Sequence, residues 1–322
     1  MGLFLQIVSA AVLIALLVDH YLGEPPARWH PVVWMGNYFN AVASCVLPSS
    51  TTPINVRTLK AFWSGTFFWC AGATSVWIVA VTVQWVILKL PFALSVLLLG
   101  LALKPLLAWA MLRREVQAVE LALGQSLDAG RQRLAMLVSR ETSQLSDCEV
   151  RESAIESLAE NLNDSVVAPI FWFVLFGLPG AALYRFANTA DAMWGYRGLR
   201  HGVNWERAGK WAARADDVLS WLPARFTAVL LKLVAQGVDL KVLRAEARKT
   251  PSPNSGWPMA AMAIALGVCL SKPGIYALNP AGAAPQARDT ALAVKYASKV
   301  AVALVLLALS AIFLIAIARL YA

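Results

Sequence analysis

Long stretches without a charged side chain are the feature that most constrains the fold of this chain. Residues 1–18, 61–88 and 300–318 contain no Asp, Glu, Lys or Arg. A helix needs about 20 apolar residues to cross the roughly 30 Å hydrocarbon core of a bilayer. Since lipid offers no hydrogen-bond partner, the backbone groups of such stretches must be satisfied within helices. A further apolar run, 92–112, is interrupted by Lys104-Pro105, which predicts a kink and a lysine that faces protein or reaches the membrane surface.

Composition supports a membrane protein rather than a soluble one. Of the 322 residues, 59% are hydrophobic and only 15% are charged, and the mean hydropathy is +0.60. The net charge of +9 comes without a Lys/Arg run or an RNA-binding motif, so nucleic acid is not a predicted partner. The chain is therefore predicted to be an all-α polytopic integral membrane protein with about four spanning helices, plus re-entrant or interfacial helices and cytoplasmic helical segments. We expect it in the bacterial inner (cytoplasmic) membrane, with the lipid bilayer as a partner.

Charged residues are concentrated away from the apolar stretches. Residues 113–164 hold six basic and ten acidic side chains, and residues 185–249 hold 12 of the 28 Lys and Arg residues. Because membrane proteins keep Lys and Arg in cytoplasmic segments, residues 19–60 and 113–290 are predicted to face the cytoplasm and both termini the opposite side. The whole chain, 1–322, is predicted to form a single membrane-embedded domain with its active site facing the cytoplasm.

One apolar run, 165–184, is broken in its middle. The sequence Gly177-Leu178-Pro179-Gly180 divides it into two halves of about ten residues, each about 15 Å long as a helix, which is half a bilayer. Two structures fit this pattern, a kinked spanning helix or a re-entrant hairpin. The hairpin is favoured because it keeps the charged flanks on one side of the membrane. Residues 256–270 are also apolar but too short to span upright, so we expect them to be interfacial or re-entrant.

Four carboxylates directly precede the broken run: Glu152, Glu156, Glu160 and Asp164. Their four-residue spacing places them on one face of a helix, where like charges repel. Some cation is therefore expected opposite them, either an arginine or a metal ion. A solvated acidic helix face is the alternative, but the adjacent apolar run favours a site at the membrane surface. Ser146-Asp147 is the predicted N-terminal cap of this helix.

Further polar side chains lie within this helix, before it and in the charged segments that follow it. Carboxylate and amide oxygens suit Mg²⁺ that carries phosphates, and arginines suit the phosphates themselves, so this set indicates phosphoryl transfer. An ion-pair network that only holds helices together is the structural alternative. The sequence has no phosphate-binding loop, dinucleotide fingerprint or nucleophile elbow. The residues are Asn161, Asn188, Asp191, Asp216 and Asp217, with Arg140, Arg197, Arg214 and Arg225.

Four longer motifs in the chain read ESLAENLNDSVVAPIFW, YRFANTADAMWGYR, AARADDVLSWLPAR and SPNSGWPMAAMAIALGV. Together with shorter motifs, from about residue 19 to residue 270, they resemble the CobD/CbiB family of cobalamin biosynthesis proteins. They match in order and spacing, and also include the opening segment with His30-Pro31-Val32 and the pair Ser139-Arg140. Glu141 and Ser220 stand where the family commonly has Asp and Asn, and residues 199–210 differ from its usual wording, which leaves the amine substrate open.

The resemblance implies an adenosylcobinamide-phosphate synthase. This enzyme joins adenosylcobyric acid to an aminopropanol, usually as its O-phosphate, in an amide ligation that depends on ATP and Mg²⁺. Expected partners are the corrinoid, the aminopropanol phosphate and other membrane enzymes of late cobalamin assembly. The implied catalytic residues are Glu156, Glu160, Asp164, Arg140, Arg197 and His30, with one carboxylate or His30 as general base. Asn161, Asn188, Arg214, Arg225, Asn254 and Trp257 are implied in substrate and ATP binding. Glu160, Asp164, Asp191, Asp216 and Asp217 are the implied Mg²⁺ ligands.

Two other functions remain open at the level of sequence. Asn161-x-x-Asp164 and Asn188-x-x-Asp191 resemble diphosphate-binding motifs of membrane prenyltransferases, although Asp216-Asp217 lacks the third carboxylate of such motifs. A non-catalytic membrane transporter or signalling relative is the other alternative. The concentration of charge outside the clear spans and the lack of an internal repeat argue against a transporter.

Overall fold

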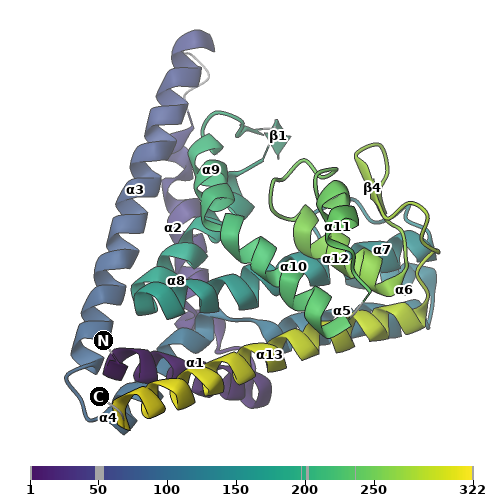
Figure 1. Cartoon of the computed structure of the whole chain (residues 1–322). Helices are drawn as coiled ribbons and strands as arrows, with labels where there is room; N and C mark the ends of the chain where they lie inside the picture. Colours follow the sequence, from purple (N-terminus) through teal and green to yellow (C-terminus); the bar gives the residue numbers. More distant parts are fainter. Residues whose placement is uncertain (1, 48–53, 197, 201–202, 236, 321–322) are drawn as a thin grey trace. The chain divides into compact units, whose positions relative to one another are not determined.

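A computed structural model describes residues 2–47, 54–196, 198–200, 203–235 and 237–320, and these lie mostly in helices (Figure 1). Two short antiparallel hairpins interrupt the helices, and the predicted all-α fold is confirmed. The helices are α1 (Gly2–Leu22), α2 (Pro31–Val46), α3 (Ile54–Ile87), α4 (Phe92–Leu103), α5 (Trp109–Leu123), α6 (Leu127–Leu134), α7 (Asp147–Leu162), α8 (Ala168–Trp194), α9 (Lys210–Leu219), α10 (Trp221–Ala235), α11 (Leu240–Ala247), α12 (Gly256–Leu266) and α13 (Ala287–Leu320). The hairpins pair β1 (Leu199–Arg200) with β2 (Val203–Asn204), and β3 (Leu270–Lys272) with β4 (Tyr276–Leu278). Short helical turns are η1 (Ala27–Trp29), η2 (Lys104–Leu106) and the π-helical η3 (Asn163–Val167).

Helices long and apolar enough to cross a membrane confirm a polytopic protein. The described part of the chain has five, against about four predicted, and α9 with α10 passes the same test only when the two helices are counted as one broken span. The additional one contains the broken apolar run. The five are Gly2–Leu22, Leu59–Ile87, Phe92–Leu123, Asp147–Trp194 and Ala287–Ile317.

The chain divides into two compact units, which we describe separately. The first unit comprises Met1–Leu107, Ala168–Ser220 and Ala308–Ala322. The second unit comprises Ala108–Val167 and Trp221–Leu307. The prediction of one membrane-embedded domain over 1–322 stays a prediction.

In the first unit, α1 packs on α4, and α8 packs against α2, α3 and α9. Gly100 permits the close approach of α1 and α4, because a Cβ atom there would lie 2.6 Å from Ile14. The kink predicted at Lys104-Pro105 is present as η2. Lys104 is buried and faces protein, as one of the two predicted possibilities, and its Nζ lies 3.3 Å from Asp19 Oδ1 and 2.9 Å from Glu24 Oε2.

The predicted break in the apolar run is present at Gly177 within α8. Its φ of 69° and ψ of −157° are non-helical and accessible essentially only to glycine. The freed amide of Leu178 donates a hydrogen bond to Gln84 Oε1 of α3, at 2.7 Å. The break thus has a partner in the same unit, and the choice between a kinked span and a re-entrant hairpin stays a prediction.

In the second unit, α7 lies against α5, α6, α12 and β3. Ser146 is the predicted cap, and it forms a capping box with Glu149. The apolar piece predicted at 256–270 ends as a helix at Gly267, whose φ of 68° closes α12 before the β3–β4 hairpin begins.

Candidate active site

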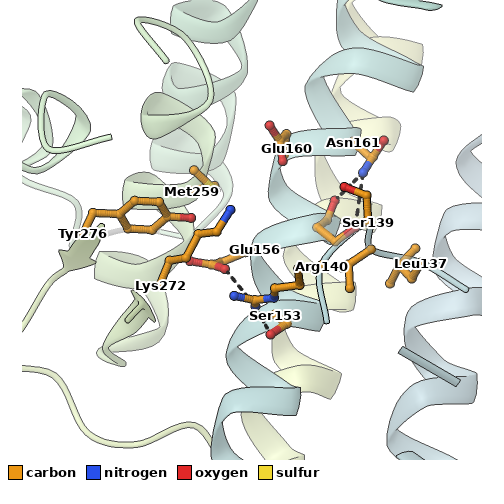
Figure 2. Close-up of a pocket in the computed structure, with 12 residues that line it drawn as sticks. Leu137, Ser139, Arg140, Ser153, Glu156, Glu160, Asn161, Met259, Lys272 and Tyr276 are labelled. Carbon is orange, nitrogen blue, oxygen red and sulfur yellow. Dashed lines mark hydrogen bonds and ion pairs between the residues drawn. The ribbon is translucent and has the colours of Figure 1, made fainter. Parts of the chain in front are cut away.

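A cavity of about 200 Å³ opens beside α7 in the second unit (Figure 2). Its walls come from three places: the middle of α7, the segment that precedes α7, and α12 with the β3–β4 hairpin. The lining residues are Leu137, Val138, Ser139, Arg140, Ser153, Glu156, Ser157, Glu160, Asn161, Met259, Lys272 and Tyr276. Four residues predicted for the site therefore line one cavity: Arg140, Glu156, Glu160 and Asn161.

Glu156 is the most deeply placed carboxylate of this cavity, with only 6% of the residue exposed. Arg140 Nη2 lies 3.5 Å from its Oε2, so an arginine is the cation expected opposite the carboxylates. Arg140 also donates to Ser153, which in turn donates to the carbonyl of Glu149. Glu156 Oε1 is buried and has no hydrogen-bond partner among the described residues. Buried carboxylate oxygens are normally paired, so this atom is available to a ligand.

Asn161 completes the polar wall one turn further along α7. Its amide nitrogen donates to the carbonyl and the hydroxyl of Ser157, at 3.0 and 3.2 Å. Since the nitrogen is used in this way, the amide oxygen is the atom left to accept from, or coordinate, a ligand.

Lys272 and Tyr276 belong to the cavity although the sequence analysis did not identify them. Both come from the β3–β4 hairpin and line the cavity on the side of Glu156 (Figure 2). Burial, and then the negative charge of Glu156, raise the pKa of Tyr276, so its phenol is a neutral hydrogen-bond donor. The signal that predicts this hairpin is Pro273-Gly274, a turn-forming pair in which Gly274 has a φ of 73°.

The outer carboxylates of the predicted row do not line the cavity. Glu152 Oε2 accepts from the amide and the hydroxyl of Ser271, at 2.9 and 2.6 Å, and so anchors β3 to α7. Asp164 lies in the π-helical turn η3 and accepts from the side chain of Asn163 at 2.8 Å. The wider π turn rotates Asp164 away from the row, so the four-residue spacing overstates how far one face continues.

His30 lies in the first unit, where it begins α2. Its Nδ1 accepts from the amide of Val32 at 3.3 Å, and its Nε2 lies 3.0 Å from Glu24 Oε2. Burial opposes ionisation of Glu24, but hydrogen bonds from His30 and Lys104 lower the pKa of this carboxyl. Both ring nitrogens of His30 are thus engaged in a local network, and its role as a base stays a prediction.

The remaining polar residues predicted in the first unit lie on α8 and α9. Asn188 donates to Asp216 Oδ1 at 3.4 Å and accepts from Arg185 at 3.2 Å, which links the two helices. Asp191 lies further along α8. Asp217 follows Asp216 on α9, and Arg214 is exposed on the same helix. Arg197 lies outside the described residues.

A second cavity in the second unit is lined by two residues predicted to bind substrate or ATP, Arg225 and Trp257, and a third, Asn254, contacts Arg225. It measures about 650 Å³ and lies among α10, α11 and the start of α12. Arg225 Nη1 donates to Asn254 Oδ1 at 3.1 Å, and the guanidinium lies 4.9 Å from the centre of the Trp257 ring.

Comparison with known proteins decides the family. A profile described as CobD/Cbib protein matches residues 12–318. The chain belongs to the CobD/Cbib family. A probable cobalamin biosynthesis protein CobD of Thermococcus kodakarensis is 40% identical over 82% of this chain and 83% of its own length. The cobalamin biosynthesis protein CobD of Chromobacterium violaceum is 39% identical over 80% of this chain and 79% of its own length. No solved structure is significantly similar to this chain.

The donor set of this CobD/Cbib protein fits Mg²⁺ only in combination with phosphate. No group of three or more His, Cys, Asp or Glu side chains that would hold a metal ion occurs within the described ranges. Of the predicted ligands, Glu160 and Asp164 belong to the second unit, and Asp191, Asp216 and Asp217 belong to the first. Mg²⁺ commonly uses one or two carboxylates plus phosphate and water oxygens. Glu160 and the Asn161 amide oxygen, beside the Oε1 atom of Glu156, supply such a set.

Proposed function

We propose that this CobD/Cbib protein is an amide ligase of cobalamin biosynthesis that depends on ATP and Mg²⁺. It joins adenosylcobyric acid to aminopropanol, or to its O-phosphate, and gives adenosylcobinamide or its phosphate. The observation that carries the proposal is the buried, unpartnered Oε1 of Glu156 in a cavity that also holds Glu160, Arg140 and Lys272. The family and the printed names of its relatives support the pathway.

The reaction has two bond-forming steps. A carboxylate oxygen of the corrinoid attacks the γ-phosphorus of ATP, the bond from that phosphorus to the bridging oxygen breaks, and ADP leaves. The amine nitrogen then attacks the acyl carbon and forms the amide bond. Phosphate leaves with the former carboxylate oxygen, and one proton of the amine passes to a base.

The side chains of the α7 cavity suit these steps. Arg140 and Lys272 offset negative charge on the phosphoryl oxygens, where positioning and electrostatic stabilisation supply most of the catalysis. Glu160 and Asn161 would hold Mg²⁺, which supplies charge neutralisation for the phosphates. Glu156 Oε1 accepts the amine proton, and the protonated phenol of Tyr276 donates a hydrogen bond to the acyl oxygen.

The cellular setting follows from the same proposal. ATP is a cytoplasmic substrate, so the α7 cavity faces the cytoplasm and the apolar helices lie in the cytoplasmic membrane. The corrinoid and the aminopropanol phosphate reach the site from that side, and other membrane enzymes of late cobalamin assembly are partners in the transfer of product.

The direct test is the reaction itself. The purified protein is incubated with adenosylcobyric acid, aminopropanol O-phosphate and MgATP, and the amide product is detected by its mass. We expect product only when all three reactants are present, and none after chelation of Mg²⁺ with EDTA. Product formation by a preparation without the protein, or its absence with a correctly folded protein, contradicts the proposal.

A further inference from the structure

The second cavity of the second unit is strongly basic. Three arginines line it: Arg225 of α10, Arg244 of α11 and Arg248, which directly follows α11. The described residues that form its walls include no Asp or Glu. Two tryptophans form its apolar part. The full lining is Trp221, Arg225, Arg244, Ala247, Arg248, Thr250, Pro251, Ser252, Pro253 and Trp257.

Arg225 is held in place before any ligand arrives. Its guanidinium lies 4.3 Å from the ring centre of Trp221 and 4.9 Å from that of Trp257. It donates to the carbonyls of Trp221 and Pro253, at 2.6 and 3.3 Å, and to Asn254 at 3.1 Å. A guanidinium has five N–H donors. The remaining donors of this pre-positioned group are therefore available to an anion without further ordering of the side chain.

Arg244 and Arg248 lack a protein anion. They are exposed at four-residue spacing at the end of α11, and neither makes an ion pair or a side-chain hydrogen bond with the described residues. Like charges at this spacing on a helix repel each other. The nearest acidic residue in sequence, Glu246, is occupied by Lys249 at 2.6 Å and by the amide of Asn279 at 2.7 Å. A bound anion is the partner that relieves this repulsion.

We infer that this cavity is a binding site for a phosphate ester. The guanidinium groups of Arg225, Arg244 and Arg248 bind the phosphate oxygens, since planar forks of donors match phosphate geometry. The indole faces of Trp221 and Trp257 cover the organic part of the ligand. The same helix, α12, contributes Trp257 to this cavity and Met259 to the α7 cavity, so α12 borders both cavities.

Two kinds of ligand present such a phosphate ester. One is the phosphorylated amine of the ligation, and this assignment rests on the proposed function. The other is an anionic phospholipid headgroup, because Trp221 and Leu222 are about half exposed on an apolar helix. Both present a phosphate ester joined to an organic chain.

The test measures binding without turnover. The protein is placed in phosphatidylcholine nanodiscs without ATP and titrated by calorimetry with 1-amino-2-propanol O-phosphate and, in parallel, with 1-amino-2-propanol. We expect the phosphate ester to bind at least tenfold more tightly than the alcohol. The double variant Arg244→Gln/Arg248→Gln should lose this preference, whereas Lys241→Gln, an exposed cation on α11 that does not line the cavity, should keep it.

A lipid arm distinguishes the sources. In nanodiscs that contain phosphatidylglycerol, native mass spectrometry counts lipid retained by the wild type and by the double variant. Retention that depends on the two arginines, without binding of the soluble ester, identifies the lipid as the source. The inference is overturned if wild type and double variant bind the ester and the alcohol equally in the calorimetry and also retain equal amounts of phosphatidylglycerol. If the wild type binds the ester through the two arginines but forms no amide product, only the proposed function is contradicted.

Discussion

At the scale of single residues, the account depends on Glu156. A buried polar atom without a partner costs about 1–3 kcal/mol, so a chain that keeps one commonly uses it. The same helix offers a contrasting residue one turn earlier, Glu152, whose Oε2 is fully engaged by Ser271. The two glutamates therefore allow the proposed catalytic role of Glu156 to be tested against a structural role on the same helix.

Glu156→Gln should leave folding almost intact and reduce ligation by about 100-fold or more, because the substitution keeps the shape but removes the proton acceptor. Thermal unfolding in detergent is measured beside the ligation rate. Glu152→Gln is the control and should lower stability by about 1–2 kcal/mol while the rate per folded molecule stays near normal. If Glu156 served only in an ion pair with Arg140, breaking that buried pair would instead cost about 3–5 kcal/mol of stability.

Lys272→Met should reduce kcat/KM by about 10- to 100-fold, since it removes one cation from the transferring phosphoryl group. Stability should change by less than about 0.5 kcal/mol, because Lys272 lies at a cavity wall and makes no ion pair with the described residues. Lys241→Met, which alters an exposed lysine outside both cavities, is the matched control. Equal rates in the two variants would remove Lys272 from the mechanism.

The sequence predicted only the local half of the α7 cavity. The residues found from sequence all lie on α7 or in the segment just before it, and the predicted cap marks where this helix begins. They are Arg140, Glu156, Glu160 and Asn161. Lys272 and Tyr276 enter from a hairpin far along the chain, and no spacing rule connects them to α7. Arg244 and Arg248 were missed for a different reason, since paired surface arginines are informative only once the absence of a neighbouring carboxylate is known.

At the scale of elements, charge-free runs and capping residues correctly predicted where helices form, begin and break. The apolar stretches became helices, Ser146 caps α7, and Gly177 breaks α8, each as its residues indicate. The π-helical turn at Asn163–Val167 and the two- and three-residue strands were not predicted. Such elements are too short for periodicity to show, and tertiary contacts decide them.

Gly177→Ala should lower stability by about 3 kcal/mol or more, because its backbone conformation excludes a side chain and a Cβ would lie 2.1 Å from Gln84 Oε1. Gly267→Ala is the matched control. Gly267 has nearly the same φ, 68°, but an added Cβ there meets nothing within 4 Å, so the cost should stay at about 1–2 kcal/mol. Thermal unfolding of both variants in detergent is the measurement, and equal losses would show that the contact with Gln84 contributes nothing.

At the scale of the whole molecule, the predicted topology keeps the flanks of residues 165–184 on the cytoplasmic side. The four native cysteines are first replaced by Ala, and a single cysteine is then introduced at exposed Gln144 or at exposed Ala192. Each should react with a membrane-impermeant thiol reagent in inside-out vesicles and remain unlabelled in intact cells. Labelling of the two positions from opposite sides would instead require a spanning helix between them.

The family and the membrane character of the chain followed from sequence, whereas the chemistry stays a proposal that isotope transfer tests most directly. Adenosylcobyric acid labelled with ¹⁸O in its free carboxylate is ligated in the presence of MgATP, and the released phosphate is analysed by mass. Activation of the carboxylate by phosphoryl transfer predicts one ¹⁸O atom in each phosphate formed with the amide product. Amide formation with unlabelled phosphate would contradict the account.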